Sequence, residues 1–125
     1  MSMIVNRRDL DFMLYEALDL DTLLESERYA DYDRESLDAM LSLCQSIAED
    51  EFLPCAAKLD ANEPKFIDGK VETIPELKQA IAAFKEAGLS ASGYDADIGG
   101  MQLPWMVDQA LNGLFAVSYT HLRAH

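Results

Sequence analysis

The fold is decided by the stretch Glu86-Ala-Gly-Leu-Ser-Ala-Ser-Gly-Tyr-Asp-Ala-Asp-Ile-Gly-Gly-Met-Gln-Leu-Pro-Trp105. Gly88 is expected just past the end of one helix, where a positive φ costs an achiral residue nothing. Gly99-Gly100 predicts a backbone turn that side chains would obstruct. Pro104 favours the first turn of a second helix, because the missing N–H of proline is not needed there. Two helices are therefore joined by a shaped loop of about fifteen residues, longer than most connections in a compact domain.

The residues before this loop predict several amphipathic helices. Asn6 is expected to cap the first helix, and Asp21 is expected to cap a short turn after it. Asp33 is expected to cap the longest helix, whose apolar face continues for about six turns. Pro54 lies inside that helix, so we expect a kink near residues 50–54, or two helices in near-continuation. The apolar face consists of Leu37, Met40, Leu41, Cys44, Ile47, Ala48, Phe52, Cys55 and Leu59.

Residues 62–87 predict a small hairpin followed by another helix. Asp68-Gly69 lies between two short apolar runs, which is a hairpin signal. Thr73 and Glu76 fit a capping box, with Pro75 in the first helical turn. The chain is therefore predicted to be all-α, with four to five helices. The apolar stripes of the last two helices are Leu77, Ala80, Ile81, Phe84 and Ala87, and then Trp105, Ala110, Leu111, Leu114 and Phe115.

The central loop and the N-terminal segment resemble parts of one enzyme family. A helix ending in Glu-Ala-Gly-Leu, an acidic turn, Gly-Gly and a new helix resemble the N-terminal helical domain of flavin-dependent acyl-CoA dehydrogenases. That family usually has a proline and an aromatic residue just before its Gly-Gly, whereas this chain has Asp95 or Tyr94, and Ile98, in those places. The variant Asp-Ala-Asp-Ile-Gly-Gly-Met-Gln-Leu-Pro-Trp is closer to a branch resembling 3-methylmercaptopropionyl-CoA dehydrogenase. That branch also has an N-terminal segment similar to residues 4–33 here, with Asp-Phe-Met-Leu-Tyr-Glu-Ala-Leu-Asp-Leu at its centre.

The resemblance, over residues 4–116, implies a function that this chain would serve only in part. Acyl-CoA dehydrogenases oxidise the Cα–Cβ bond of an acyl-CoA thioester, with a glutamate base in a C-terminal domain and FAD as the hydride acceptor. The full-length enzyme would bind FAD, use an acyl-CoA substrate and an electron acceptor, and form a homo-oligomer. The chain itself would lack the catalytic base and the flavin site. Loop 93–104 would face the acyl pocket, with Gly99, Gly100, Met101 and Leu103 shaping its wall. An acyl-CoA oxidase or another flavoprotein relative would share this helical domain.

Charge and composition disfavour several classes of partner. The net charge is −13, and residues 1–63 hold 16 acidic and 5 basic side chains. Such an acidic surface repels nucleic acid and anionic membranes. The first residues lack the apolar run of a secretion signal, and nothing approaches the ~20 apolar residues of a membrane span. Cys44 and Cys55 would lie ~16 Å apart on one helix, beyond disulfide reach, so we expect two buried thiols in a reducing cytoplasm.

The residues themselves reveal no catalytic constellation. Asp95 and Asp97 resemble the opening of a calcium loop, but two later positions lack the necessary oxygen ligands. Gly99-Gly100 fits no phosphate-binding pattern. The three carboxylates of residues 49–51 are interpreted as a solvated helix face, with pKa values near the usual range.

The last nine residues, 117–125, are interpreted as a non-native tail. They leave the helical pattern in mid-helix, and they match one translated frame of a common transposase sequencing adapter. His121 and His125 have the i, i+4 spacing of a metal site, but both lie in this tail, so we expect no metal site. The chain would then divide into an N-terminal extension at residues 1–33, an incomplete helical domain at 34–116, and the tail.

Two interpretations of the whole chain remain open. As an enzyme fragment, it would leave its apolar stripes partly uncovered, and we expect low stability or self-association. If the chain is complete as written, it would instead be a stand-alone acidic helical module that binds a protein partner.

Overall fold

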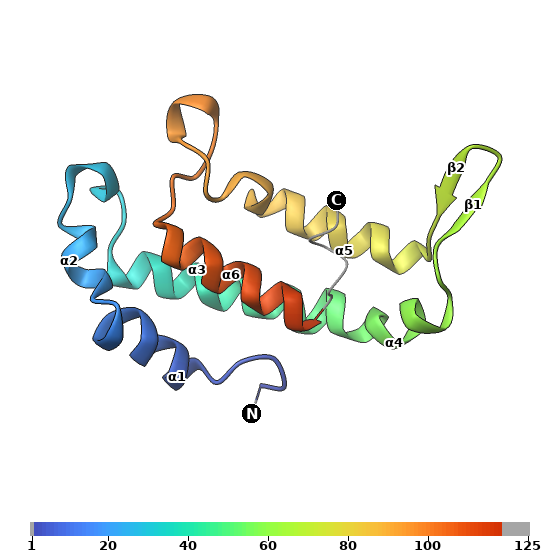
Figure 1. The fold of residues 1–125 in the computed structure, drawn as a ribbon, viewed down its shortest axis with the longest axis horizontal. Coiled ribbons are helices and arrows are strands. Elements are labelled where there is room, and N and C mark those ends of the chain that lie inside the picture. The colour runs from blue at the N-terminus through green and yellow to red at the C-terminus, as the bar shows by residue number, and fades with distance from the viewer. Residues whose placement is uncertain (1, 119–125) are drawn as a thin grey trace.

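Residues 2–118 fold into five helical segments and one small hairpin (Figure 1). The computed structural model describes residues 2–118. α1 runs directly into the π-helical turn η1, and α3 continues through the π-helical turn η3 into α4. The predicted all-α fold with four to five helices is confirmed for this range. In chain order the elements are α1 (Arg7–Asp11), η1 (Phe12–Ala17), α2 (Leu20–Leu24), η2 (Glu27–Tyr29), α3 (Arg34–Ile47), η3 (Ala48–Phe52), α4 (Leu53–Ala61), β1 (Lys65–Ile67), β2 (Lys70–Glu72), α5 (Pro75–Glu86), η4 (Leu89–Ala91), η5 (Ala96–Ile98) and α6 (Trp105–Ser118).

Pro54 widens the longest helix without ending it. Proline has no N–H to donate to the carbonyl four residues back, and its ring crowds that turn. The structure adopts π-helical hydrogen bonding over η3, and α4 then follows α3 without a break in the helical path (Figure 1). The expected near-continuation at residues 50–54 is confirmed. Asp33 caps α3 as predicted, because its carboxylate accepts from the amide of Ser36 at 2.7 Å.

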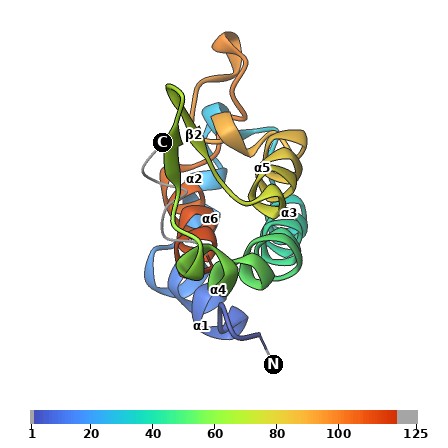
Figure 2. The same ribbon diagram turned by 90° about the vertical axis from the view of Figure 1, so that its right-hand side faces the viewer.

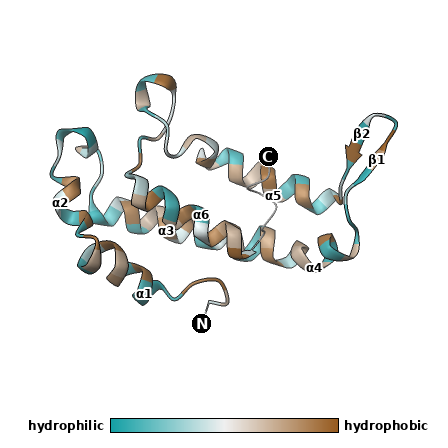
Figure 3. Ribbon diagram, in the orientation of Figure 1, coloured by the Kyte–Doolittle hydropathy of each residue, from teal (hydrophilic) through white to brown (hydrophobic). Residues whose placement is uncertain are grey.

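The core lies where the long helix meets α5 and α6, which Figure 2 shows end-on. The ring of Phe115 stands edge-on to two others, 5.6 Å from Phe52 and 5.0 Å from Phe84. Such edge-to-face pairs add about 0.5–1.5 kcal/mol beyond the burial of their area. Figure 3 shows hydrophobic residues interspersed with hydrophilic ones along these helices, as amphipathic stripes require. The three helices are therefore held together mainly by their apolar faces.

The N-terminal segment, residues 2–33, lies against α3. Leu20 is fully buried, and the guanidinium of Arg7 pairs with the carboxylate of Asp38 on α3 at 2.6 Å. Asn6 caps α1 as predicted, accepting from backbone amides of the first turn. Helices as short as α1 and α2 are marginal in water, so this packing accounts for their formation.

Two other predicted caps are wrong. Asp21 lies inside α2, which begins after Asp19, a residue with φ of +51°. Thr73 does not cap α5, because the N-cap position is occupied by Ile74, whose side chain makes no capping bond. Pro75 is the first residue of α5, and its missing N–H leaves one donor fewer for a cap to satisfy.

The predicted hairpin is confirmed. β1 and β2 pair antiparallel, with Phe66 opposite Val71 and the turn at Asp68 and Gly69. Both turn residues have positive φ, +49° and +78°, as the two-residue hairpin turn requires. Every residue of both strands is exposed.

α6 continues two residues into the segment predicted to be a non-native tail. Val117 and Ser118 are helical, and the hydroxyl of Ser118 donates to the carbonyls of Leu114 and Phe115, each at 3.1 Å. The prediction that the helical pattern stops before Val117 is wrong for these two residues, since a serine can bond back to the preceding turn and remain buried. Residues 119–125 lie outside the described range.

Candidate functional site

The loop between α5 and α6, residues 87–104, projects away from the bundle (Figure 1). It leaves α5 at Gly88, whose φ is +76° and whose amide donates to the carbonyl of Lys85 at 2.9 Å. Gly88 therefore ends the helix as predicted. The loop ends at Pro104, which directly precedes α6. We expected this proline in the first turn of the helix, and it lies one position before it. Trp105 was predicted to join the apolar stripe of α6, but its side chain is 71% exposed.

The loop has two limbs that are hydrogen-bonded to each other. The first contains Ala91 and Ser92, and the second contains Met101 and Leu103. The amide of Met101 donates to the carbonyl of Ala91 at 3.0 Å. The amide of Leu103 donates to the carbonyl of Ser92, also at 3.0 Å. Because these bonds satisfy the backbone internally, the loop has a defined shape even where its side chains are exposed.

The two adjacent glycines are required for different reasons. Gly99 has a φ of +88°, in the left-handed region. At Gly100 a β-carbon would lie 2.0 Å from the carbonyl oxygen of Tyr94. The predicted turn that side chains would obstruct is therefore confirmed. The direction that a β-carbon would take at Gly100 is occupied by the backbone of Tyr94, so the packing of the loop itself requires this glycine.

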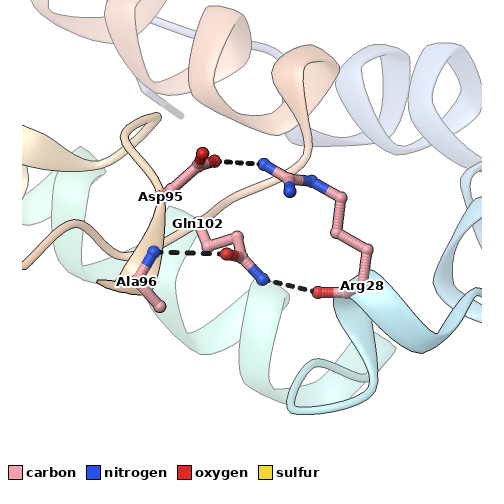
Figure 4. Close-up of polar contacts among 4 residues, drawn as sticks. All are labelled: Arg28, Asp95, Ala96 and Gln102. Carbon is pink, nitrogen blue, oxygen red and sulfur yellow. Dashed lines mark hydrogen bonds and ion pairs between the residues drawn. The ribbon is translucent and has the colours of Figure 1, made fainter. Parts of the chain in front are cut away.

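A side chain from the loop bridges to the N-terminal segment, as Figure 4 shows. The side-chain amide of Gln102 donates to the carbonyl of Arg28 at 2.8 Å, and its side-chain oxygen accepts from the amide of Ala96 at 3.2 Å. The guanidinium of Arg28 in turn pairs with the carboxylate of Asp95. Arg28 therefore connects the N-terminal segment to the loop twice, through its backbone carbonyl and through its side chain.

Tyr32 adds a contact further along the same segment. Its hydroxyl donates to the carbonyl of Met101. Burial, and to a smaller extent the charge of Asp31, raises the pKa of the Tyr32 phenol, so the hydroxyl stays protonated and able to donate. We call the four residues Arg28, Tyr32, Asp95 and Gln102 the loop clasp.

The clasp holds a strained residue. Gln102 has a φ of +54°, and a left-handed conformation costs a residue with a β-carbon about 1–2 kcal/mol. The hydrogen bonds of the Gln102 side chain and of its backbone amide offset this cost. Strained residues of this kind are over-represented at functional loops.

Asp108 of α6 fixes the other limb. Its carboxylate is buried and accepts from the hydroxyl of Ser92 and from the side-chain amide of Asn112, the latter at 3.1 Å. A β-carbon on Gly93 would lie 3.2 Å from the Asp108 carboxyl carbon, so the limb approaches the carboxylate closely. An acidic residue in the first turn of a helix is favourable by itself, so the sequence pattern does not indicate that this one is buried.

The four residues predicted to shape a pocket wall lie on one limb but differ in burial. Gly99 is exposed, Gly100 and Met101 are half-buried, and Leu103 is 4% exposed and belongs to the core. They are close in sequence, but they do not form one continuous exposed surface. Their role in a substrate pocket stays a prediction.

A shallow hollow lies elsewhere, between α4 and α5. It contains the ion pair of Lys58 with Glu76, and the thiol of Cys55, whose pKa is raised chiefly by burial. None of the predicted pocket-wall residues lines it. Its lining consists of Asp50, Glu51, Pro54, Cys55, Lys58, Glu76 and Gln79.

The prediction for the carboxylates of residues 49–51 is wrong for one of them. The hydroxyl of Ser2 and then the side-chain amide of Gln45 hydrogen-bond to Glu49 and lower its pKa. The sequence could not reveal this, since Ser2 is 47 positions away. The two cysteines are free and buried as predicted, and burial raises the pKa of Cys44 to about 12.

Within residues 2–118, no cluster of three or more histidine, cysteine, aspartate or glutamate side chains is placed to hold a metal ion. His121 and His125 lie outside the described residues. No helix of this range combines the length and the apolar character needed to cross a bilayer.

Comparison with known proteins gives one informative match. The broad-specificity linear acyl-CoA dehydrogenase FadE5 of Mycobacterium tuberculosis is 34% identical over 110 residues, which cover 86% of this chain and 18% of that protein. This chain is similar to part of an acyl-CoA dehydrogenase. It spans less than a fifth of the length of that curated relative. No family model matches the chain, and no solved structure matches it.

Proposed function

We propose that the chain is the N-terminal helical part of an FAD-dependent acyl-CoA dehydrogenase, which carries out α,β-dehydrogenation of an acyl-CoA thioester. The observation that carries this proposal is the 34% identity over 110 residues to FadE5. The all-α fold agrees with the helical domain implied by the sequence motifs. The chain by itself would be inactive, because the catalytic base and the flavin site would lie in the remainder of the enzyme.

The loop between α5 and α6 is the part that would meet substrate. We propose that Gly99, Gly100 and Met101 border the acyl pocket, and that Leu103 supports them from the core. Support comes from the shape of this loop, which is fixed by the loop clasp on one limb and by Asp108 on the other. A pre-shaped loop is what a substrate wall needs, since it costs no ordering when the ligand binds.

We propose that FAD does not bind to this chain alone. The hollow between α4 and α5 is lined by three carboxylates against one lysine, which would repel a diphosphate. We therefore assign flavin binding to other parts of a full-length enzyme, together with the site of the electron acceptor, and we propose that the full-length enzyme forms a homo-oligomer. The two free, buried thiols support a reducing cytoplasmic location.

We further propose that the enzyme belongs to the branch resembling 3-methylmercaptopropionyl-CoA dehydrogenase, and that residues 117–125 are a non-native tail. A long DNA read across the codon for Ala116 tests both the fragment and the tail. A frame that continues into a β-rich segment and a C-terminal helical domain with a candidate base glutamate supports the dehydrogenase. A read that confirms residues 117–125 and a nearby stop contradicts it and favours the stand-alone helical module.

The purified 125-residue chain offers a second test. We expect no flavin absorbance after purification with added FAD, because we assign the flavin site to other parts of a full-length enzyme. Stoichiometric flavin that stays with the chain would contradict the domain assignment. In a full-length enzyme, Met101→Ala should change the ratio of kcat/KM values for long and short acyl-CoA substrates, whereas Phe66→Ser on the distant hairpin should leave the ratio unchanged.

A further inference from the structure

The hairpin carries an apolar pair that nothing in the described chain covers. β1 and β2 extend beyond the helices (Figure 1), and the side chains of Phe66 and Val71 are 75% and 65% exposed. The register places these two residues opposite each other, so both project from the same face of the hairpin. A two-stranded hairpin alone is marginally stable in water, so a cover for this face would stabilise it.

The hairpin also has a free hydrogen-bonding edge. In a hairpin with a two-residue turn, the pair next to the turn, Ile67 with Lys70, is hydrogen-bonded, and the next pair is not. The N–H and C=O of Val71 therefore point away from β1. No third strand pairs with this edge within residues 2–118.

We propose that β2 pairs antiparallel with β2 of a second copy of this chain, about a two-fold axis at Val71. In that register the two Val71 residues exchange both backbone hydrogen bonds, since each presents one donor and one acceptor outward. The result is a four-stranded sheet with an apolar stripe of Phe66, Val71, Val71 and Phe66 across one face. A self-complementary edge of this kind gives a closed, two-fold interface.

Charge complementarity favours a second copy of this chain as the partner of the β2 edge. The two-fold register places Lys70 of each copy opposite Glu72 of the other, and such opposite-charge pairs stabilise a sheet. The opposite face then carries Lys65, Glu72, Lys70 and Ile67 across the four strands, and the charges of the first three alternate in sign. Lysine on an edge strand ordinarily discourages pairing, but here each lysine meets a glutamate.

The other edge does not offer the same match. Antiparallel pairing of β1 with itself, centred on Phe66, would place Lys65 opposite Ile67 and form no ion pair. The elements are only three residues long, so the interface is small and the dimer is weak, forming at high protein concentration. This dimer does not depend on the proposed enzyme function.

Sedimentation equilibrium of the 125-residue chain, over a concentration series reaching the millimolar range, tests the proposal. We expect a monomer–dimer equilibrium. Val71→Pro removes the central N–H and should abolish dimerisation, while Val71→Thr retains the N–H and the β-branch and should still dimerise. Circular dichroism of both variants should be unchanged, because the hairpin lies outside the core.

Two charge variants test the proposed register of the dimer more specifically. Lys70→Glu alone or Glu72→Lys alone makes both facing pairs repulsive and should raise the dissociation constant about tenfold or more. An equimolar mixture of the two variants restores opposite charges at both pairs and should form a heterodimer. A chain that stays monomeric throughout the series overturns the proposal. Self-association that survives Val71→Pro also overturns it, because another exposed apolar surface, or a different occupant of the hairpin, would then be responsible.

Discussion

The side-chain amide of Gln102 donates to the backbone carbonyl of Arg28, 74 positions earlier in the chain, at 2.8 Å. Through this bond the N-terminal segment touches the loop that joins the last two helices (Figure 4). The segment is too short to fold alone, and the loop contains a strained residue. The loop gives the segment a surface to pack against, and the segment gives the strained residue a hydrogen-bond partner. Substitutions at this contact therefore test whether the loop has a fixed shape.

Substituting Gln102 separates its contacts from its strain. Gln102→Ala removes both side-chain bonds and keeps the unfavourable φ, so we expect a loss of about 1 kcal/mol in the free energy of unfolding. Gln102→Gly loses the same bonds but adopts a φ of +54° without strain, and should be more stable than the alanine variant by about 1 kcal/mol. Urea unfolding of both variants measures the difference. Equal stability, or a more stable alanine variant, would contradict the assignment of strain.

Hydrogen exchange then locates the effect. Gln102→Glu keeps an acceptor for the amide of Ala96 but places a carboxylate against the carbonyl of Arg28. Exchange at the Ala96 amide should accelerate in Gln102→Ala and remain slower in Gln102→Glu. Similar acceleration in both would mean that the whole loop is released.

Three glycines provide a graded set of alanine substitutions. Gly100→Ala puts a β-carbon 2.0 Å from the Tyr94 carbonyl oxygen and should cost about 3 kcal/mol, because two backbone segments must move apart. Gly99→Ala meets no atom within 4 Å and pays only for its positive φ, about 1 kcal/mol. Gly113→Ala lies in the open on α6 and should stabilise the helix by about 1 kcal/mol.

Thermal or urea unfolding of the three variants checks this order. A mild effect at Gly100, comparable with that at Gly99, would show that the two limbs of the loop are not held together as described. A destabilising effect at Gly113 would show that this face of α6 is covered.

The sequence predicted those parts of the fold whose physics is local. Asn6 and Asp33 cap helices through bonds to amides two or three residues away, and Gly88 ends one through its own φ. The Asp68-Gly69 turn sets its hairpin register by itself. Each of these depends on a few consecutive residues, so the pattern alone decides the outcome.

The candidate site was predictable only as a loop. Its position and its two glycines could be read from the sequence, but the clasp could not, because nothing near Arg28 indicates that Asp95 will face it. The same holds for Asp108, whose partner Ser92 lies 16 positions earlier. Contacts between exposed-type polar residues far apart in sequence follow from tertiary packing, and several chain paths would satisfy the same apolar stripes.

Removing the buried carboxylate of Asp108 should loosen the first limb of the loop. Asp108→Ala leaves the hydroxyl of Ser92 without its acceptor and removes one of the two acceptors of the Asn112 side-chain amide, and we expect a loss of about 2 kcal/mol in the free energy of unfolding. Asp97→Ala is the matched control, because Asp97 is an exposed acid of the same loop, and it should change stability by less than about 0.5 kcal/mol. Comparable losses of stability in the two variants would contradict the proposal that Asp108 holds the first limb of the loop in place.

Cys44 should make stability fall in alkali. Burial raises the pKa of its thiol to about 12 in the folded chain, from an ordinary value of 9.0. Below pH 9 the thiol is protonated in both states, and its contribution to stability is fully present. Between pH 9 and about 12 the unfolded chain loses this proton and the folded chain keeps it, so unfolding becomes progressively easier with a slope that approaches one proton. Tyr15 and Tyr32 also have raised pKa values and act in the same direction at higher pH.

Comparison with Cys44→Ala isolates the contribution of that thiol, because the variant retains every other group that titrates. Urea unfolding between pH 8 and 11 should show a shallower decline for the variant than for the parent chain. At pH 8 the native Cys44 should also resist alkylation by iodoacetamide and react once the chain is unfolded in urea, since the thiolate is the reactive form and burial suppresses it. Rapid alkylation of Cys44 in the native chain, or identical pH slopes for the two proteins, would show that the apolar face of α3 is open to solvent.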